Sequence, residues 1–164
     1  MRRANTAKDK PETTMTRFFI TGIAGLFLAM PANTEPINPA DIWVLDGDTI
    51  QVHHQHPNVR LVGFNAPETR NASCPAEAEL GARATRRLRE LVRAGGLDFE
   101  YVRCSCPEGT QGTSACNWKR DCGTLRSNGR DVGSILIAEG LAVSFVCGAT
   151  SCPKTPRPWC PPKS

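Results

Sequence analysis

Side chains suited to phosphate and cation chemistry gather between residues 46 and 69, in the stretch DGDTIQVHHQHPNVRLVGFNAPET. Asp48, Arg60, Asn65 and Glu68 all lie in it. Arginine offers paired donors of fixed geometry to phosphate oxygens, carboxylate and amide oxygens suit hard cations such as Ca²⁺, and a carboxylate can take a proton from water. These residue types together are typical of phosphate-ester hydrolysis. The rest of the chain must bring them to one place, usually at strand ends on a rigid scaffold.

Five strands are expected from runs in which apolar residues alternate with polar ones. They span 42–45, 49–54, 59–65, 97–104 and 122–127. The DGD turn separates the first two strands. Pro67 stops the third, because proline lacks a backbone N–H and disfavours helical geometry at the preceding residue. Glu68 is therefore expected on a loop that leaves the third strand.

Two helices are expected from apolar residues at helical spacing. The first spans 75–95 and ends at the Gly95-Gly96 pair, and VGSILIAEGLA predicts a short second helix within 132–142. We expect the arginines of the first helix to form a solvated face, with weak attraction of anions as the alternative. They are Arg83, Arg86, Arg87, Arg89 and Arg93.

Length and composition are those of one ordinary domain with a tail. The 164 residues are 40% hydrophobic and 22% charged, which argues against wholesale disorder and against a protein with several membrane spans. The net charge is only +4. A bias this weak gives little support to nucleic-acid binding by bulk charge, so any such function must rest on local geometry.

The N-terminal region has the pattern of a secretory signal, because Arg17 precedes the apolar run FFITGIAGLFLAM, which is too short to span a bilayer comfortably. We expect a signal peptide at 1–32, with an uncleaved anchor as the alternative and Met15 as an alternative start. Residues 33–40 have the composition of a linker. A secreted or periplasmic location follows, with no stable membrane span once the signal is removed.

Eight cysteines follow this region, and an even number behind a signal favours disulfides made in an oxidising compartment. They are Cys74, Cys104, Cys106, Cys116, Cys122, Cys147, Cys152 and Cys160. Zinc is the alternative, but the spacings lack the paired CxxC pattern of common structural zinc sites. We interpret the proline-rich segment 148–164 as an extension fastened by disulfides.

Three neighbouring histidines, His53, His54 and His56, suggest a metal site. Adjacent residues of a strand face opposite sides, so only His54 and His56 can share a face. We therefore expect a polar hairpin tip.

The predicted elements describe an α+β, mainly β domain at 41–147, a small five-stranded barrel of OB type with two to three helices, stabilised by disulfides. DGDTI, VRLVGFNAPET, a helix, WKR and NGRDVGSILIAEGLA resemble the staphylococcal nuclease (thermonuclease) family in order and spacing. The match covers about residues 41–146, and its first two motifs are specific. The resemblance implies a hydrolase of DNA and/or RNA phosphodiesters that uses Ca²⁺ and has little sequence specificity, and we expect a monomer.

The resemblance also implies roles for individual residues. Asp48 takes the position of a metal-ligating aspartate, and Ala66 that of the residue whose backbone carbonyl binds the metal. Arg60 and Arg120 match the two arginines that hold the scissile phosphate. Glu68 matches the glutamate that activates or positions water.

The sequence departs from the family pattern at several positions. Asn65 replaces a second metal-binding aspartate, which predicts weaker metal binding or another divalent cation, since ligand charge tunes calcium affinity. Val146 and Gly148 stand where the family has two tyrosines near the base. Trp118, beside Arg120, either offers a stacking face or belongs to the core, and we expect the core.

Two alternatives to an enzyme remain. One is a catalytically inactive module of the same fold that binds nucleic acid or a protein partner. The other is a disulfide-rich adhesion or inhibitor domain, which would leave the two arginines without a purpose. At the level of single residues, Arg60 and Glu68 can also be an ordinary surface ion pair, and Asp46 and Asp48 can be turn formers only.

Overall fold

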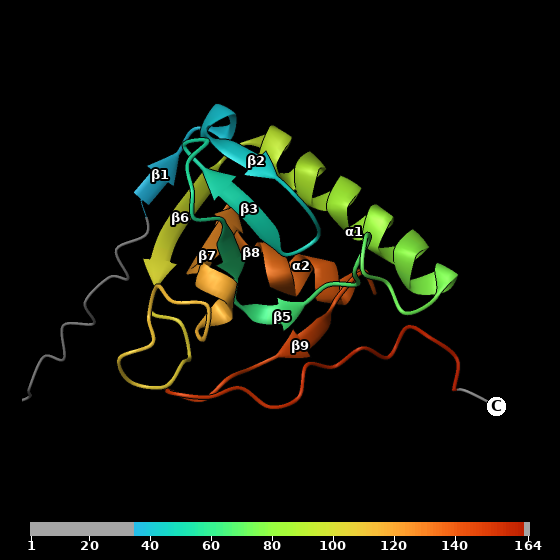
Figure 1. Ribbon diagram of the computed structural model, residues 1–164. Coiled ribbons are helices and arrows are strands. Elements are labelled where there is room, and N and C mark those ends of the chain that lie inside the picture. Colours follow the sequence, from blue (N-terminus) through green and yellow to red (C-terminus); the bar gives the residue numbers. More distant parts are fainter. Residues whose placement is uncertain (1–34, 163–164) are drawn as a thin grey trace, which may run out of the picture. The chain divides into compact units, whose positions relative to one another are not determined.

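A computed structural model of the chain describes residues 35–162, which form a curled β-sheet with two α-helices beside it (Figure 1). The expected class, α+β and mainly β, is confirmed. The segment expected to be a signal peptide or anchor, 1–32, lies outside the described residues. Among the described helices, none is both long and apolar enough to cross a membrane.

The described residues form nine short strands where the sequence predicts five. They are β1 Glu35–Ile37, β2 Ile42–Val44, β3 Thr49–Val52, β4 Val59–Leu61, β5 Gly63–Asn65, β6 Leu97–Val102, β7 Asp121–Ser127, β8 Arg130–Asp131 and β9 Val143–Phe145. Seven of them make one sheet in the order β1-β6-β7-β4-β3-β2, with β8 paired to β7. β4 and β7 run parallel, and the other pairs are antiparallel.

The third predicted strand, 59–65, is broken into two. Gly63 has a φ of +93°, a left-handed conformation that side chains rarely adopt, so the chain turns after β4 and leaves the sheet. β5 pairs with β9 instead, with Asn65 opposite Val143. The continuous strand expected from the alternation is therefore wrong, and the break turns Asn65 back toward the side chain of Arg60.

Part of the segment expected to be a linker, 33–40, belongs to the sheet. Glu35–Ile37 forms β1, which pairs with β6 and places Ile37 opposite Leu97. A 3-10 turn at Pro39–Asp41 then leads into β2. Regular secondary structure that packs on the domain therefore begins before residue 41.

The first helix, α1 at Pro75–Ala94, matches its prediction. Proline stands at its first turn, where a missing N–H costs nothing, and Gly95 follows it with a φ of +78°. The second helix, α2 at Val132–Ala138, is shorter than predicted. The side chain of Asp131 accepts a hydrogen bond from Ser134 N at 2.7 Å and caps its N-terminus.

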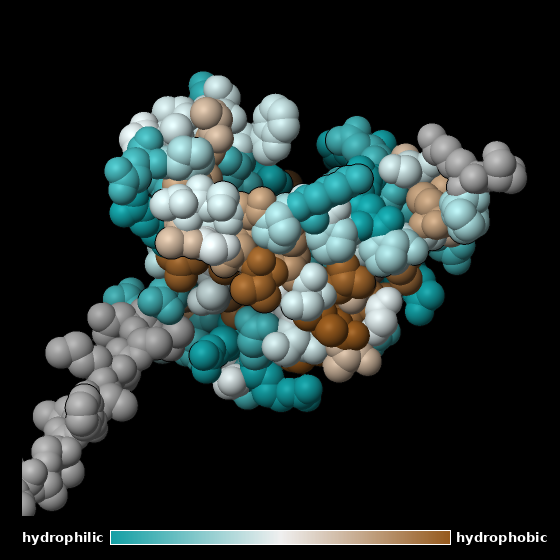
Figure 2. All heavy atoms as spheres, turned by 90° about the horizontal axis from the view of Figure 1, so that it is seen from below, coloured by the Kyte–Doolittle hydropathy of each residue, from teal (hydrophilic) through white to brown (hydrophobic). Residues whose placement is uncertain are grey.

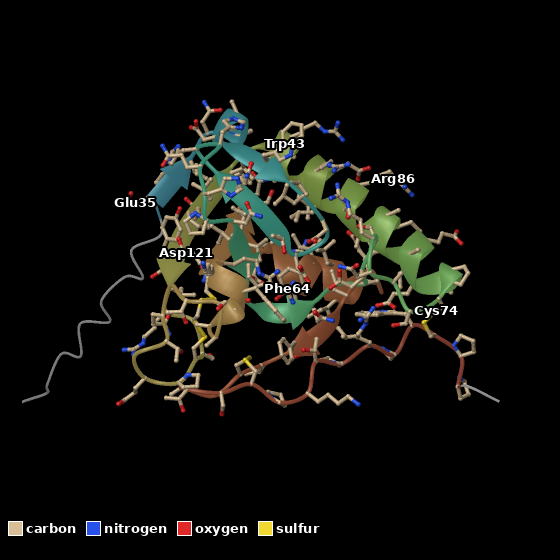
Figure 3. All side chains as sticks on the ribbon, in the orientation of Figure 1. Glu35, Trp43, Phe64, Cys74, Arg86 and Asp121 are labelled. Carbon is tan, nitrogen blue, oxygen red and sulfur yellow. A yellow bond between two sulfur atoms is a disulfide. The ribbon has the colours of Figure 1, made fainter. Side chains whose placement is uncertain are left out.

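The main apolar core lies between the sheet and the two helices, and a smaller cluster of buried residues surrounds the disulfides between β6 and β7. Ile50, Leu61, Leu88 and Leu136 are at most 1% exposed, and burial of such a side chain stabilises the fold by about 1.5–3 kcal/mol. Phe64 packs against Gly133 of α2 and so fixes β5 on the helix (Figure 3). Seen from below, apolar side chains gather across the middle of the face, with hydrophilic ones around them (Figure 2).

All eight cysteines form disulfides, which confirms that expectation and rules out the zinc alternative. The pairs are Cys74–Cys160, Cys104–Cys122, Cys106–Cys116 and Cys147–Cys152. Two of them cross-link the segment between β6 and β7. The Cys74–Cys160 bond joins the start of α1 to the C-terminal segment, and Figure 3 labels Cys74 beside that segment.

Candidate active site

A cleft of about 590 Å³ opens between β4, β5 and the disulfide-bonded segments. Its lining includes parts of the segment between β6 and β7 and of the C-terminal segment. Four arginines line it, Arg60, Arg103, Arg120 and Arg157, and the acidic side chain among its described lining residues is Glu68. The cleft therefore has the charge expected for an anionic ligand.

Arg60 projects from the centre of the sheet, where β4 lies between β3 and β7. Its side chain is 13% exposed and forms an ion pair with Asp48 Oδ2. The same guanidinium donates hydrogen bonds to Asn65 Oδ1 at 2.8 Å and to Phe64 O at 3.3 Å. Burial, and then the nearby charge of Arg120, lower the pKa of Arg60 to about 10, so the group is a cation at neutral pH.

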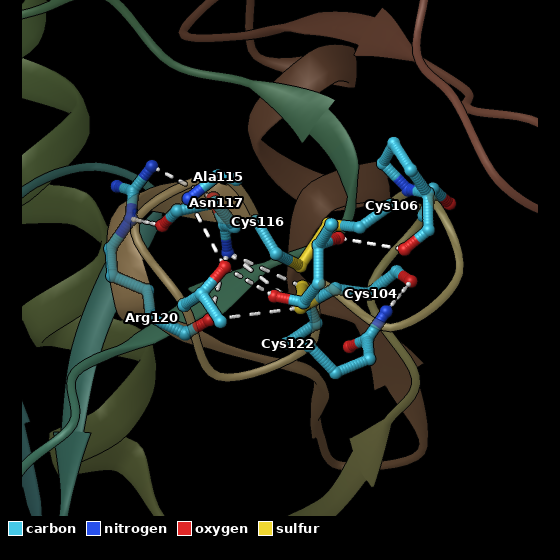
Figure 4. The surroundings of a disulfide bond; sticks show 12 residues. Cys104, Cys106, Ala115, Cys116, Asn117, Arg120 and Cys122 are labelled. Carbon is cyan, nitrogen blue, oxygen red and sulfur yellow. Dashed lines mark hydrogen bonds between the residues drawn. A yellow bond between two sulfur atoms is a disulfide. The ribbon is translucent and has the colours of Figure 1, made fainter.

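Arg120 comes from the loop that enters β7, and the residues around it are drawn in Figure 4. Its Nε donates to Asn117 O at 3.1 Å and its Nη2 to Asn117 Oδ1 at 3.0 Å. Nη1 donates to Thr49 Oγ1 at 3.4 Å, which ties the loop to β3. Burial lowers the pKa of Arg120, and the charges of Asp46 and Glu68 partly offset this effect.

Glu68 lies on the loop after β5, as predicted, and lines the same cleft. The preceding Pro67 is fully buried. A Cβ at Gly81 of α1 would come within 2.6 Å of Pro67 O and 2.8 Å of Glu68 O, so the helix supports this loop directly. The charge of Glu68 raises the pKa of both Arg60 and Arg120, and all three side chains line the cleft.

The residues expected to bind metal lie together, but their polar atoms already have partners. Asp48 Oδ1 accepts from Thr49 Oγ1 at 3.1 Å, and Asp48 Oδ2 accepts from Ala66 N at 2.9 Å as well as pairing with Arg60. Asn65 Oδ1 also accepts from Arg60. Oxygens of Asp48 and Asn65 thus face one cation, the guanidinium.

This donor set is chemically compatible with Ca²⁺, because all its ligands are hard oxygens. It is poor in charge, since Asp48 supplies the carboxylate and Asn65 only an amide. In the part of the chain that the structure describes, no three His, Cys, Asp or Glu side chains are grouped as metal ligands usually are. A divalent ion at this position would share Asp48 and Asn65 with Arg60.

Sequence reasoning treated Asp46 as a turn former and did not include it in the site. Its Oδ1 accepts from Asp48 N at 3.1 Å, which is indeed a turn contact. Burial raises the pKa of Asp46, although the charges of Arg60 and Arg120 oppose the rise. Asp46 is therefore a second carboxyl beside the arginine pair. In the sequence, the closeness of Asp46 to Asp48 is the feature that could predict a second carboxyl here.

The C-terminal segment also contributes to the site, which the interpretation as a mere extension missed. Asn65 Nδ2 donates to Pro156 O at 2.9 Å. Arg157 lines the cleft and donates to both carboxylate oxygens of Glu77, at 2.9 Å each. Glu77 is fully buried at the start of α1, beside the Cys74–Cys160 bond. The sequence alone does not show that Cys160 pairs with Cys74, so it could not predict that this segment reaches the site.

Two further expectations have clear outcomes. Trp118 is 81% exposed and lines the cleft, so its expected place in the core is wrong. The histidines bind different partners: His53 lies 3.6 Å from Asp41, His54 bonds to Ala40 O at 2.9 Å, and His56 lies 3.5 Å from Gln51. They form an exposed turn with no common centre, as the hairpin-tip interpretation predicts.

Val146 lines the cleft and is 72% exposed, whereas Gly148 is exposed outside it. Neither position presents an aromatic ring.

A scan of the chain against protein-family models found no match, and neither did a search of the curated proteins. The site places the guanidiniums of Arg60 and Arg120 and the carboxylate of Glu68 in the lining of one cleft, and oxygens of Asp48 and Asn65 contact Arg60. Such a set can bind a phosphate and move a proton.

Proposed function

We propose that this protein is a nuclease of the staphylococcal nuclease type, which hydrolyses phosphodiester bonds of DNA and/or RNA with little sequence specificity. The observation that carries the proposal is the convergence of Arg60, Arg120 and Glu68 in one cleft. Arg60 comes from the sheet, Arg120 from a cross-linked loop and Glu68 from a loop supported by α1. A purely structural ion pair does not need two arginines that repel each other.

The strand order supports an OB-type barrel. β2, β3 and β4 form a meander, β4 pairs in parallel with β7, and β6 links β7 to β1. If β1 and β2 count as two halves of one first strand, this is a five-stranded, partly open barrel. The cleft then lies on the barrel at β4, the strand that carries Arg60, and at β5.

The chain's own residues account for phosphate binding and proton transfer. Arg60 and Arg120 donate to the nonbridging oxygens of the phosphate, where negative charge grows in the transition state. With a pKa of about 10, Arg60 keeps its charge at the pH of the reaction. Glu68 accepts a proton from the attacking water. The leaving oxygen takes up a proton from solvent.

A divalent cation fits this chemistry. Asp48, the amide oxygen of Asn65 and the backbone carbonyl of Ala66 are the residues that would hold it, with Ca²⁺ as the first choice. When bound, such an ion polarises the phosphoryl group. Arg60 donates to two of these three residues here, so transfer of its guanidinium to the substrate phosphate would free their oxygens.

We further propose that the protein acts as a monomer in an oxidising compartment, secreted or periplasmic. The four disulfides support the oxidising compartment, because such bonds persist where thiols are not kept reduced.

A second candidate function is a catalytically inactive module that binds nucleic acid. It is favoured by one observation: the guanidinium of Arg60 takes up both Asp48 and Asn65, as a replacement for a lost metal would. Such a module binds its ligand with or without calcium.

The test uses the oxidised protein with 5′-labelled single-stranded DNA and Ca²⁺, and in parallel with RNA. We expect cleavage that EDTA abolishes. Arg60→Ala, Arg120→Ala and Glu68→Gln should each lower the rate by about 100-fold or more, the usual range for a phosphate-holding or proton-transferring group. Arg86→Ala is the matched control, because Arg86 is exposed on α1 (Figure 3).

The control variant should cleave at the wild-type rate. Absence of EDTA-sensitive cleavage above the level of Arg60→Ala, on both DNA and RNA, would overturn the enzyme proposal. Binding that ignores calcium would then support the inactive module.

A further inference from the structure

The C-terminal segment, residues 147–162, runs from β9 along one side of the cleft to the start of α1 (Figure 1). Four of its residues line the cleft, and they are Cys147, Cys152, Thr155 and Arg157. The carbonyl oxygen of Pro156 accepts a hydrogen bond from Asn65 Nδ2 at 2.9 Å. A backbone group of this segment thus contacts a side chain on the proposed metal side of the site.

The segment is fastened on both sides of Pro156. Before it, β9 pairs with β5, the strand that carries Asn65. After it, Arg157 donates to both carboxylate oxygens of Glu77 at 2.9 Å each, and Cys160 forms the disulfide with Cys74. Glu77 is fully buried, so the arginine is attached to the body of the domain. The Pro156 carbonyl is therefore held at a defined place beside β5.

The sequence makes this part of the segment stiff. Pro156 and Pro158 are prolines, and Thr155 and Arg157 each precede one of them. Proline fixes its own φ, and the residue before it is confined to extended conformations. All four consecutive residues have a restricted backbone, so little conformational entropy is lost when the Pro156 carbonyl is held in place.

The side-chain amide of Asn65 suits its surroundings in one orientation. Its Oδ1 accepts from Arg60 Nη2 at 2.8 Å while its Nδ2 donates to Pro156 O at 2.9 Å. A reversed amide would set its NH₂ group against a guanidinium, which has only donors, and its oxygen against a carbonyl, which has only acceptor lone pairs. Asn65 is 5% exposed, so water gives little compensation for such a mismatch.

Transfer of the Arg60 guanidinium to a substrate phosphate removes one of these two partners. Pro156 O still accepts from Nδ2, so the oxygen of the amide stays on the side that it shares with Asp48. A carboxylate at position 65 would not need this partner, because its two oxygens are equivalent acceptors. An asparagine does need it, since only one end of its amide can bind a cation.

We propose that the C-terminal segment is a positioning element of the site, in which Pro156 O fixes the Asn65 amide so that its oxygen stays available to a divalent cation when Arg60 binds substrate. The inference rests on the proposed function for the cation and the substrate, whereas the orientation of the amide depends on neither. The segment then does more than fasten the fold. It allows an asparagine to serve as the oxygen ligand where the family pattern has an aspartate.

The first test observes the amide directly, by NMR of the full-length, oxidised, metal-free protein. The double variant Pro156→Gly/Pro158→Gly keeps every carbonyl and removes the stiffness. The side-chain amide protons of Asn65 should shift upfield and exchange with water about threefold to tenfold faster, as expected when a hydrogen bond is weakened. Pro161→Gly is the matched control, because Pro161 is exposed and lies beyond the Cys160 bond. Unchanged Asn65 signals in the double variant would overturn the proposal.

The second test measures Ca²⁺ binding by calorimetry in the Arg60→Ala background, where no guanidinium holds the amide oxygen and no substrate is needed. Addition of Pro156→Gly/Pro158→Gly should weaken Ca²⁺ binding by about threefold to tenfold, the worth of one hydrogen bond. The same two substitutions should change nothing once Asn65→Asp is also present. Equal losses with and without Asn65→Asp would reveal a general structural effect and overturn the positioning role. Absence of Ca²⁺ binding by Arg60→Ala would overturn it as well.

These outcomes separate the positioning role from the proposed function. A protein whose Asn65 amide and Ca²⁺ binding respond as expected, but which never cleaves nucleic acid, keeps the positioning role and loses the nuclease. EDTA-sensitive cleavage, with Asn65 signals and Ca²⁺ binding that ignore the proline substitutions, keeps the nuclease and loses the positioning role.

Discussion

The side-chain amide of Asn65 accepts a hydrogen bond from Arg60 Nη2 at 2.8 Å, and this contact links β5 back to the strand that precedes it. The other end of the same amide donates to Pro156 O at 2.9 Å. Asn65 therefore joins Arg60 to the C-terminal segment. A carboxylate at this position could keep the first bond and would lose the second, since it has no donor.

Asn65→Asp is expected to strengthen divalent-ion binding. The change adds a negative charge beside Asp48, and ligand charge tunes calcium affinity. The Ca²⁺ concentration for half-maximal cleavage should fall several-fold. A modest rise in the cleavage rate is expected for a working enzyme, whereas a large gain from almost nothing would favour the inactive module.

Asn128→Asp serves as the control for added charge, because Asn128 lies in an exposed turn away from the cleft. Calcium dependence that is identical in the wild type, Asn65→Asp and Asn128→Asp would contradict the assignment of Asn65 to the metal side.

The ion pair between Glu77 and Arg157 should make the fold sensitive to acid. Burial raises the pKa of Glu77, but hydrogen bonds from Arg157 and Ser73 N outweigh it, so the pKa lies below the ordinary value of 4.5. A lowered carboxyl pKa contributes stability that is complete above pH 4.5 and is lost as the pH falls through the folded-state pKa. Glu77→Gln should remove this part of the pH dependence, measured by urea unfolding from pH 7 to pH 3.

Arg157→Ala should lower the free energy of unfolding at pH 7 by about 1.5–3 kcal/mol, because it leaves the fully buried carboxylate without its charged donor. Lys154→Ala, an exposed cation of the same segment, is the control and should change little. A wild type and Glu77→Gln with parallel pH profiles would show that the pair does not stabilise the fold.

Two disulfides of the C-terminal region should differ in their effect on stability. Cys74–Cys160 closes a separation of 86 residues, and Cys147–Cys152 one of 5. If chain entropy dominates, the longer loop stabilises by about 4–5 kcal/mol and the shorter by about 2 kcal/mol. Replacement of each pair by serine, followed by urea unfolding, compares them. Equal losses would mean that native contacts, not loop closure, set these values.

Much of the local structure could be predicted from the sequence, because it depends on local chemistry. Pro75 and Gly95 bound α1 as expected, and alternation identified the strands that carry Arg60 and the core. The grouping of Arg60, Arg120 and Glu68 was predicted through the family resemblance, and the cleft brings them together.

The rest depends on contacts between distant residues, which no local pattern reveals. β5 leaves the sheet at Gly63 to find β9, some eighty residues later, and alternation continues unbroken across that point. The contribution of Pro156 and Arg157 depends on which cysteine Cys160 joins. The sequence predicts Trp118 in the core because apolar residues usually bury, whereas it is exposed on a loop between two disulfides.

Asn117 is expected to be a positioning residue for Arg120. Its side-chain oxygen accepts from Arg120 Nη2 at 3.0 Å, and its backbone oxygen accepts from Arg120 Nε at 3.1 Å (Figure 4). Removal of the side chain frees the guanidinium, and loss of one charge-assisted hydrogen bond should lower kcat/KM for DNA cleavage by about tenfold.

The pair Asn117→Ala and Asn117→Gly separates this role from backbone strain. The φ of +49° at Asn117 is unfavourable for alanine and free for glycine, so only the alanine variant should lose about 1 kcal/mol or more of stability to strain. Both variants should lose the same activity, because both lack the amide. Full cleavage by Asn117→Gly would show that the loop conformation alone orients Arg120 and that the side chain of Asn117 takes no part.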